Sequence, residues 1–157
     1  AADEGAKVLL YEAGEALRYD EFSIRAGVKG IVKVMRNVGM LNRAKSKGHS
    51  IKPFVARQSG WVRANVSGFV MHKAQLGDHV SKGDVLAVIS NPFGEELGTI
   101  DSPATGVVIG KQNIPLAQEG EAIYHVAYFK KPDQVAEHVE LLQDNLVVPN
   151  DTVDIKM

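Results

Sequence analysis

A stretch in the second half of the chain occurs twice, and this internal repeat constrains the fold more than any other feature. Residues 67–71 correspond to residues 105–109, 38 positions later, and residues 80–88 correspond to residues 117–125, 37 positions later. Each copy has the pattern strand, glycine turn, strand. Two such hairpins related by a pseudo-twofold axis bury a common apolar core that neither could bury alone. The repeat therefore predicts a small all-β domain over residues 53–130.

Short β-type runs separated by glycine turns fill this region, which is typical of a small barrel or sandwich. The predicted strands cover residues 60–64, 68–72, 85–90, 98–101, 106–110 and 122–129. The phrases GDHVSKGD (77–84) and SPATGVV (102–108) are similar to those of the barrel-sandwich hybrid in biotinyl and lipoyl carrier domains. A carrier needs a lysine at the hairpin tip, but no lysine lies between Lys82 and Lys111. We therefore expect neither biotin nor lipoate.

Residues 1–41 have a different character and predict the end of an α/β domain. The apolar run 7–11 is typical of a strand buried in a parallel sheet. Asp20 is suited to cap a helix that ends at Gly39. The helix would carry an apolar stripe at helical spacing, formed by Ile24, Val28, Ile31, Met35 and Val38. A lone strand and helix cannot form a core, so further strands would come from elsewhere.

Two polar or short segments complete the predicted organisation. Residues 42–52 lack periodicity and predict a linker. Residues 131–157 predict a C-terminal helix and tail, with Val135, Val139 and Leu142 on the apolar side of the helix. The predicted class is α+β: the C-terminal strand and helix of an α/β domain, then a barrel-sandwich hybrid domain, then the C-terminal helix.

Composition narrows the class of protein. The 157 residues include no cysteine, which excludes a disulfide scaffold and a thiolate-bound metal. There is no apolar run of 18 residues and no signal-peptide pattern, so we expect a cytoplasmic protein with no membrane partner. The chain begins without Met, and we expect it to be part of a longer parent protein.

Charge is distributed unevenly. Residues 22–77 contain no acidic side chain, although the net charge of the whole chain is −1. Such a stretch attracts nucleic acid or a carboxylate substrate, or it is an ordinary solvated surface. The basic residues lack the interleaved aromatics of a nucleic-acid platform, so we favour the solvated surface and expect no nucleic-acid partner.

The order of these segments, over residues 7–129, resembles the C-terminal part of the succinylglutamate desuccinylase/aspartoacylase family. The phrases that carry the resemblance are LLYEAGEALR (9–18), IRAGVKGI (24–31), NPFG (91–94) and VIGKQNIPL (108–116). The resemblance implies that the first segment ends a carboxypeptidase-like α/β catalytic domain, which binds one zinc through His-x-x-Glu and a distant His. It also implies hydrolysis of the amide bond in an N-acyl amino acid or a similar small molecule.

Glu12 matches the catalytic glutamate of that family. Its predicted place at the carboxyl end of a buried strand agrees with this role, because open α/β sheets have their sites there. The resemblance implies that its carboxylate takes a proton from zinc-bound water and returns it to the leaving amine. The competing interpretation is a strand-end carboxylate that caps a loop or pairs with Arg18. Glu15 is the nearest alternative and is expected to pair with a basic neighbour.

The family's metal ligands are not found in this sequence. The histidines are His49, His72, His79, His125 and His138, and they match no recognised ligand spacing. We therefore expect no metal site in this chain and no activity from it alone. Zinc would be held by the remaining N-terminal part of the same protein, which is the expected partner.

The tip of the hairpin between the repeats is the candidate for the part nearest the substrate. Asn91, Phe93 and Glu95 would form a loop that restricts access to the active site, and the alternative is an ordinary hairpin turn. The rival function for the chain is a non-enzymatic barrel-type binding or adaptor module. Homo-oligomer formation is left open.

Overall fold

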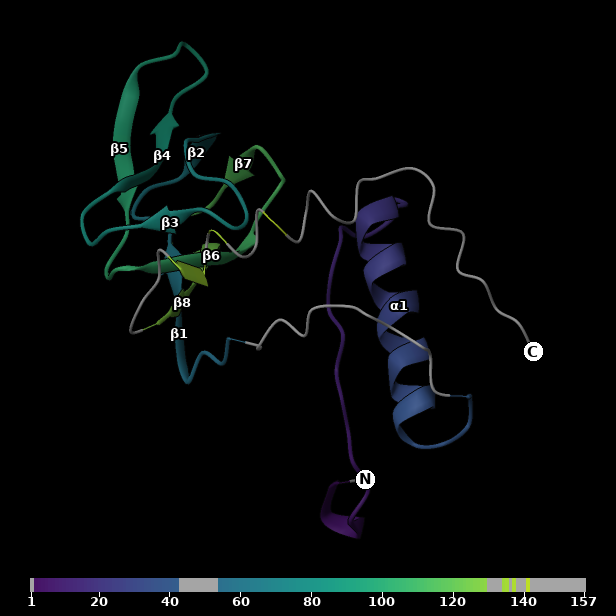
Figure 1. Cartoon of the computed structure of the whole chain (residues 1–157). Coiled ribbons are helices and arrows are strands. Elements are labelled where there is room, and N and C mark those ends of the chain that lie inside the picture. Colours follow the sequence, from purple (N-terminus) through teal and green to yellow (C-terminus); the bar gives the residue numbers. More distant parts are fainter. Residues whose placement is uncertain (1, 43–53, 130–133, 136, 138–140, 142–157) are drawn as a thin grey trace. The chain divides into compact units, whose positions relative to one another are not determined.

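The computed structural model describes residues 2–42 and 54–129, together with positions 134, 135, 137 and 141. The described residues belong to two compact units, one on each side of residues 43–53, and each unit is described by itself (Figure 1). The first unit contains a 3-10 helix, η1 (Ala2–Glu4), and one α-helix, α1 (Glu21–Asn37). The second contains the strands β1 (Gln58–Arg63), β2 (Gly68–His72), β3 (His79–Val80), β4 (Val85–Ser90), β5 (Glu96–Asp101), β6 (Gly106–Lys111), β7 (Leu116–Ala117) and β8 (Ala122–Tyr128).

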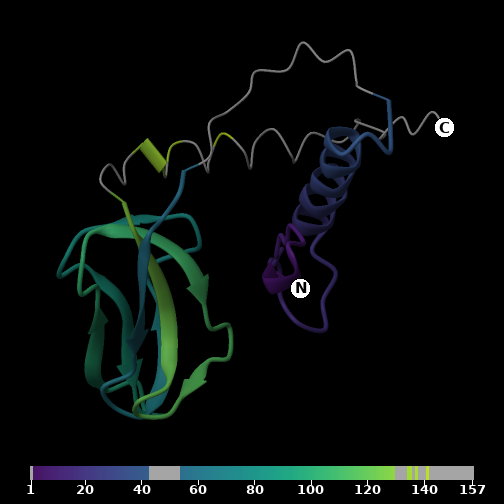
Figure 2. The ribbon, with the colours of Figure 1, turned by 90° about the horizontal axis from the view of Figure 1, so that it is seen from below.

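The β unit is built from two antiparallel sheets of four strands each (Figure 2). The strand order is β1-β8-β6-β3 in the first sheet and β5-β4-β2-β7 in the second. Apolar side chains from the inner faces of both sheets form one core cluster, which includes Leu86, Ile89, Ile123, Tyr124 and Val126. All five are fully buried. The two sheets therefore stabilise one another across a shared core, as the repeat predicted.

The internal repeat extends to the order and register of the strands. In the repeat, strands β1, β2, β3 and β4 correspond to strands β5, β6, β7 and β8. When each strand is exchanged for its counterpart, the strand order of the first sheet becomes that of the second. Registers correspond as well: Val108 pairs with Val126 as Val70 pairs with Ile89. Backbone hydrogen bonds are also matched, because Ala64 N donates to Glu121 O as Ser102 N donates to Asp84 O. The β unit is therefore a pseudo-twofold pair of four-stranded motifs.

All six predicted strands of the β unit are confirmed, with bounds that differ by a few residues. The sequence prediction missed β3 and β7, because two-residue strands give no alternation of apolar and polar positions. The barrel-sandwich hybrid detail of the prediction is not confirmed: the described strands form two antiparallel sheets, and no closed barrel occurs among them.

The predicted helix and both of its ends are confirmed. Asp20 is the N-cap, and its carboxylate accepts hydrogen bonds from Ser23 N at 3.3 Å and Ser23 Oγ at 2.7 Å. These bonds, led by the one from the Ser23 hydroxyl, lower the pKa of the Asp20 carboxyl. Gly39 follows the helix with a φ of 84°, a left-handed conformation that glycine adopts without strain.

The predicted buried strand at residues 7–11 is wrong for this structure. These residues form no strand, and their apolar side chains are exposed, Leu10 at 81%. The physical reason is the absence of a hydrogen-bonding neighbour: a strand needs a partner, and the described strands pair only among themselves. The apolar composition of residues 7–11 alone therefore does not produce a strand.

Two other predicted segments are described little or not at all. The predicted linker 42–52 lies, apart from residue 42, outside the described residues, and so do Val139 and Leu142. The described positions of the C-terminal stretch, residues 134, 135, 137 and 141, are helical, and Val135 is buried. The predicted domain boundaries stay predictions. None of the described helices is both long and apolar enough to cross a lipid bilayer.

Close approach of β2 to β4 makes Gly68 a sensitive position. A Cβ atom there would lie 2.6 Å from the Ser90 carbonyl oxygen and 2.7 Å from Ile89 Cγ2, so the backbone of two strands would have to separate. We expect Gly68→Ala to lower the free energy of unfolding by about 1–3 kcal/mol, the usual cost of overpacking. Gly98→Ala is the matched control, because its Cβ would meet nothing closer than 3.4 Å. Equal midpoints of chemical unfolding for the two variants would contradict the expectation.

Candidate functional site

The segment that carries Glu12 is fixed to α1 by its neighbour Tyr11. The Tyr11 hydroxyl donates a hydrogen bond to the Ser23 carbonyl oxygen at 2.7 Å. Its ring covers Gly27, where an added Cβ would lie 3.0 Å from Tyr11 Cε1. Gly27 thus provides the space for the aromatic ring. The backbone beside Glu12 is therefore held by α1 and not by a sheet.

The Glu12 carboxylate itself is exposed and takes part in no hydrogen bond or ion pair with another described residue. Arg18, its predicted alternative partner, is 3.2 Å from Glu15 instead, from Arg18 Nε to Glu15 Oε2. The expectation that Glu15 pairs with a basic neighbour is confirmed. Two residues after Glu12 the chain turns at Gly14, whose φ of 79° is a left-handed conformation that glycine adopts without strain. Within the described residues, therefore, the Glu12 carboxylate is left available.

The predicted tip lies between β4 and β5 and is organised by one side chain. Asn91 Oδ1 accepts hydrogen bonds from Phe93 N at 2.9 Å and Glu95 N at 3.0 Å, and Asn91 Nδ2 donates to Glu95 Oε2 at 2.6 Å. Gly94 has a φ of 85°, which completes the tight turn. The Phe93 side chain is 89% exposed. The three predicted tip residues are thus brought together, whereas Glu12 belongs to the other unit.

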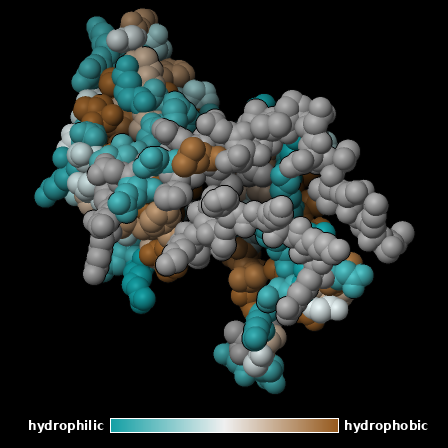
Figure 3. Space-filling view, in the orientation of Figure 1, coloured by the Kyte–Doolittle hydropathy of each residue, from teal (hydrophilic) through white to brown (hydrophobic). Residues whose placement is uncertain are grey.

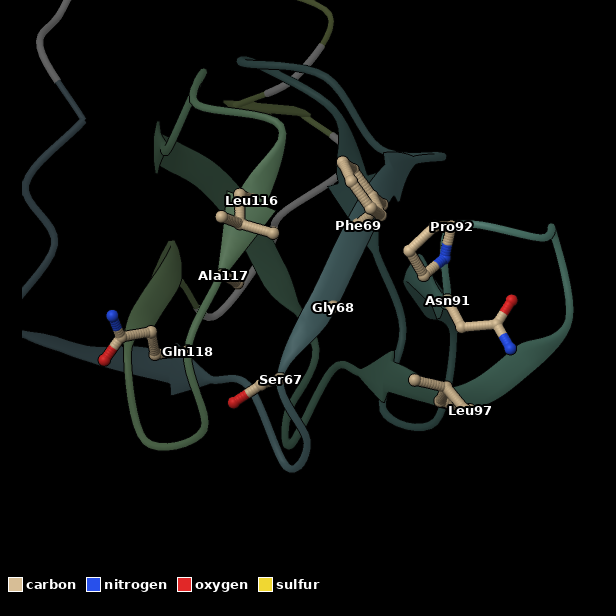
Figure 4. A pocket seen from close by; sticks show the side chains of 9 residues that line it. All are labelled: Ser67, Gly68, Phe69, Asn91, Pro92, Leu97, Leu116, Ala117 and Gln118. Atoms are coloured by element: carbon tan, nitrogen blue, oxygen red, sulfur yellow. The ribbon is translucent and has the colours of Figure 1, made fainter.

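A shallow, open groove of about 300 Å³ lies beside this tip. Figure 4 shows its lining side chains, which come from β2, from β7 and from both ends of the tip. The lining residues are Ser67, Gly68, Phe69, Asn91, Pro92, Leu97, Leu116, Ala117 and Gln118. Apart from Asn91, the sequence prediction named none of them as site residues. Phe69 and Leu116 pair directly in the register of β2 and β7, but the sequence carried no signal of this pair because β7 was not predicted.

The described histidines do not form a metal site. No group of three His, Asp or Glu side chains suited to a metal ion occurs among the described residues. His72 Nδ1 lies 2.6 Å from the Tyr124 hydroxyl, and His125 Nε2 lies 2.9 Å from Ser59 Oγ while its ring stacks on Trp61 at 4.2 Å. His49 and His138 lie outside the described residues. The described residues therefore do not fit a catalytic zinc by themselves.

His72 and Tyr124 form a polar pair at the edge of the core. The Tyr124 hydroxyl donates to the Leu86 carbonyl oxygen at 2.7 Å, so His72 Nδ1 is the donor to the Tyr124 oxygen. Burial raises the pKa of the Tyr124 hydroxyl to about 12. Burial, and then the nearby Lys111 ammonium, lower the pKa of the His72 imidazole. The pair is a structural element rather than part of the Glu12 segment.

Comparison with solved structures finds the same architecture in known enzymes. The chain is similar to a succinylglutamate desuccinylase/aspartoacylase from Rhodobacter sphaeroides, with 18% identity, a TM-score of 0.57 and coverage of 71% of this chain and 38% of that one. It is also similar to the product-bound ectoine utilization protein EutE (DoeB) from Ruegeria pomeroyi, with 20% identity, a TM-score of 0.58 and coverage of 71% and 35%.

A third structure, a succinylglutamate desuccinylase from Silicibacter sp. TM1040, gives 17% identity and a TM-score of 0.56, with coverage of 71% and 35%. The chain shares the succinylglutamate desuccinylase/aspartoacylase fold. At these identities the likeness is one of fold, and the chain spans about 35% of the length of the desuccinylase-fold proteins that it matches. No family model and no curated protein sequence matches the chain.

The half-buried imidazole of His72 predicts a pH-dependent stability. Its pKa is lowered from 6.5 in the folded state, so the unfolded chain binds more protons as pH falls below 6.5. The contribution of His72 to stability is therefore full above that pH and is lost as the pH falls from 6.5 through the lowered pKa of the folded state. We expect His72→Gln to flatten this part of the profile of unfolding free energy against pH. His125→Gln is the control and should retain the slope. If both variants keep the wild-type slope, His72 is not its source.

Proposed function

We propose that this chain contributes a catalytic carboxylate and a substrate-covering β unit to a hydrolase. The substrate class is an N-acyl amino acid or a similar small molecule with an amide bond. The observation that carries the proposal is the placement of Glu12: its segment is held by Tyr11, while its carboxylate is exposed and has no partner among the described residues. The shared desuccinylase fold supports the same reaction type.

In this proposal the role of Glu12 is to transfer a proton. As general base, the carboxylate takes one proton from the attacking water while the water oxygen bonds to the amide carbon. The carbon–nitrogen bond then breaks, and Glu12 returns the proton to the leaving nitrogen, so the products are a carboxylic acid and an amine. An exposed carboxylate on an anchored segment suits both steps, because it is accessible and its backbone is fixed.

A zinc ion would supply electrophilic activation of the carbonyl and of the water. The described residues do not fit such an ion, so its ligands would come from the remaining N-terminal part of the same protein. Exposed apolar side chains support a partner of this kind on the first unit. The stripe on α1 and the segment that precedes it are uncovered, with Val8, Leu9, Leu10, Ile24 and Val28 all exposed. Covering them with further polypeptide would remove these apolar side chains from water.

The hairpin tip is the proposed access element of this hydrolase. Asn91 fixes the backbone, so Phe93 and Glu95 are presented without further ordering of the loop. An exposed aromatic ring and a carboxylate at one rigid tip could contact a substrate through shape and charge. Removing the Phe93 ring would then change KM for different acyl groups more than it changes kcat.

The test of Glu12 is made in the longer parent enzyme with its metal bound. We expect Glu12→Gln to lower kcat by about 10²–10⁴-fold, because the amide cannot accept the proton. Zinc content and the unfolding midpoint should stay at wild-type values. Glu15→Gln is the matched control, since Glu15 is three residues away and is paired with Arg18. Turnover of the Glu12→Gln enzyme at the level of the Glu15→Gln enzyme would reject the assigned role.

A further inference from the structure

Ser23 is the only buried residue of α1, and the structure describes the whole of this helix. Its exposed fraction is 8%, whereas the apolar stripe of the same helix is exposed, with Ile31 at 62%. Figure 3 shows hydrophobic residues at the surface of this first unit. An amphipathic helix usually buries its apolar stripe, and serine is among the residues that are mostly exposed. Particular contacts with the preceding chain, and not general apolar packing, therefore cover Ser23.

The chain before α1 supplies this cover from two positions. Figure 1 shows it passing alongside the helix, and the Tyr11 hydroxyl donates a hydrogen bond to the Ser23 carbonyl oxygen at 2.7 Å. Gly14 faces the Ser23 side chain, because a Cβ added to Gly14 would be 3.5 Å from Ser23 Oγ and 3.6 Å from Ser23 Cβ. Tyr11 and Gly14 therefore face the same residue. Only Glu12 and Ala13 lie between them in the chain.

Ser23 is itself fixed by the helix cap. The Asp20 carboxylate accepts hydrogen bonds from Ser23 N at 3.3 Å and from Ser23 Oγ at 2.7 Å. The Asp20 carbonyl oxygen accepts a further bond from Ile24 N at 2.9 Å. A residue that is bound through its backbone and its side chain loses little further conformational freedom when a second segment packs on it. Ser23 is therefore a firm point of attachment for the segment that carries Glu12.

We propose that Tyr11 and Ser23 are positioning residues for catalysis by Glu12. Their hydrogen bond, together with the Gly14 contact two residues after Glu12, restricts the directions in which the carboxylate can point. More molecules of the enzyme then hold the general base in the geometry that proton transfer needs. This inference rests on the proposed function, because Glu12 is the group that is positioned. Neither Tyr11 nor Ser23 needs to touch the substrate, so their bond affects kcat and not KM.

The experiment uses Tyr11→Phe, which keeps the ring over Gly27 and removes only the hydrogen bond to Ser23. Tyr19→Phe is the matched control, since Tyr19 is 98% exposed. In the longer parent enzyme with its metal bound, we expect Tyr11→Phe to lower kcat by about tenfold, the effect of losing one hydrogen bond, at unchanged KM. In the Glu12→Gln background it should cause no further loss, because Tyr11 acts through Glu12.

A second measurement follows the backbone in the 157-residue chain itself. The NMR order parameter of the Glu12 amide should be about 0.85, the value of a rigid backbone, and should fall below about 0.6 in Tyr11→Phe. Tyr19→Phe should keep the wild-type value. This readout needs neither metal nor substrate, so it reports on the positioning of Glu12 separately from its chemistry.

Three results would overturn the positioning role and leave the proposed function standing, provided that Glu12→Gln is inactive. One is equal kcat for Tyr11→Phe and Tyr19→Phe. Another is an equal loss from Tyr11→Phe with and without Glu12→Gln, because Tyr11 would then act independently of the base. The third is an order parameter of Glu12 that does not respond to Tyr11→Phe. Wild-type turnover of Glu12→Gln, in contrast, rejects the proposed function and the positioning role with it.

Discussion

Burial of one apolar core between two symmetry-related sheets is the constraint on which the β unit depends. Each four-stranded sheet is apolar on its inner face, and neither could hide that face from water without the other. Leu86 and Ile123 occupy equivalent positions in the two repeats and are both fully buried. The close approach at Gly68 follows from the same packing, because the strands that carry the core must lie side by side without an intervening side chain.

The pattern of residues predicts this part of the molecule well because its contacts are internal to the repeat. Six strands, the Asp20 cap and the Gly39 stop were all predictable from local patterns, since glycine turns and an N-cap act within a few residues. The strands β3 and β7 were not, because two residues cannot show a period. The predicted strand at residues 7–11 is wrong for a different reason. The apolar run has the composition of a buried strand, but a strand also needs a neighbouring strand to pair with, and no local pattern supplies one.

For the candidate site too, the sequence identified some residues and missed others. The sequence identified the tip residues Asn91, Phe93 and Glu95, and the structure adds the reason why they act together, namely the two backbone bonds that Asn91 accepts. It identified Glu12 through family resemblance, and a catalytic role for that residue stays a prediction. It did not identify the groove at Phe69 and Leu116, because exposure of an apolar side chain is a property of the folded chain.

The contact between the Tyr11 ring and Gly27 has one further consequence. Glu12 derives its position from a helix and not from a strand, because the residue before it is bound to Ser23 and lies over the missing side chain of Gly27. Motion of α1 and motion of the carboxylate are thereby mechanically coupled. A change in α1 at Ser23 or Gly27 would thus displace the acid without altering the Glu12 side chain, its charge or its immediate sequence.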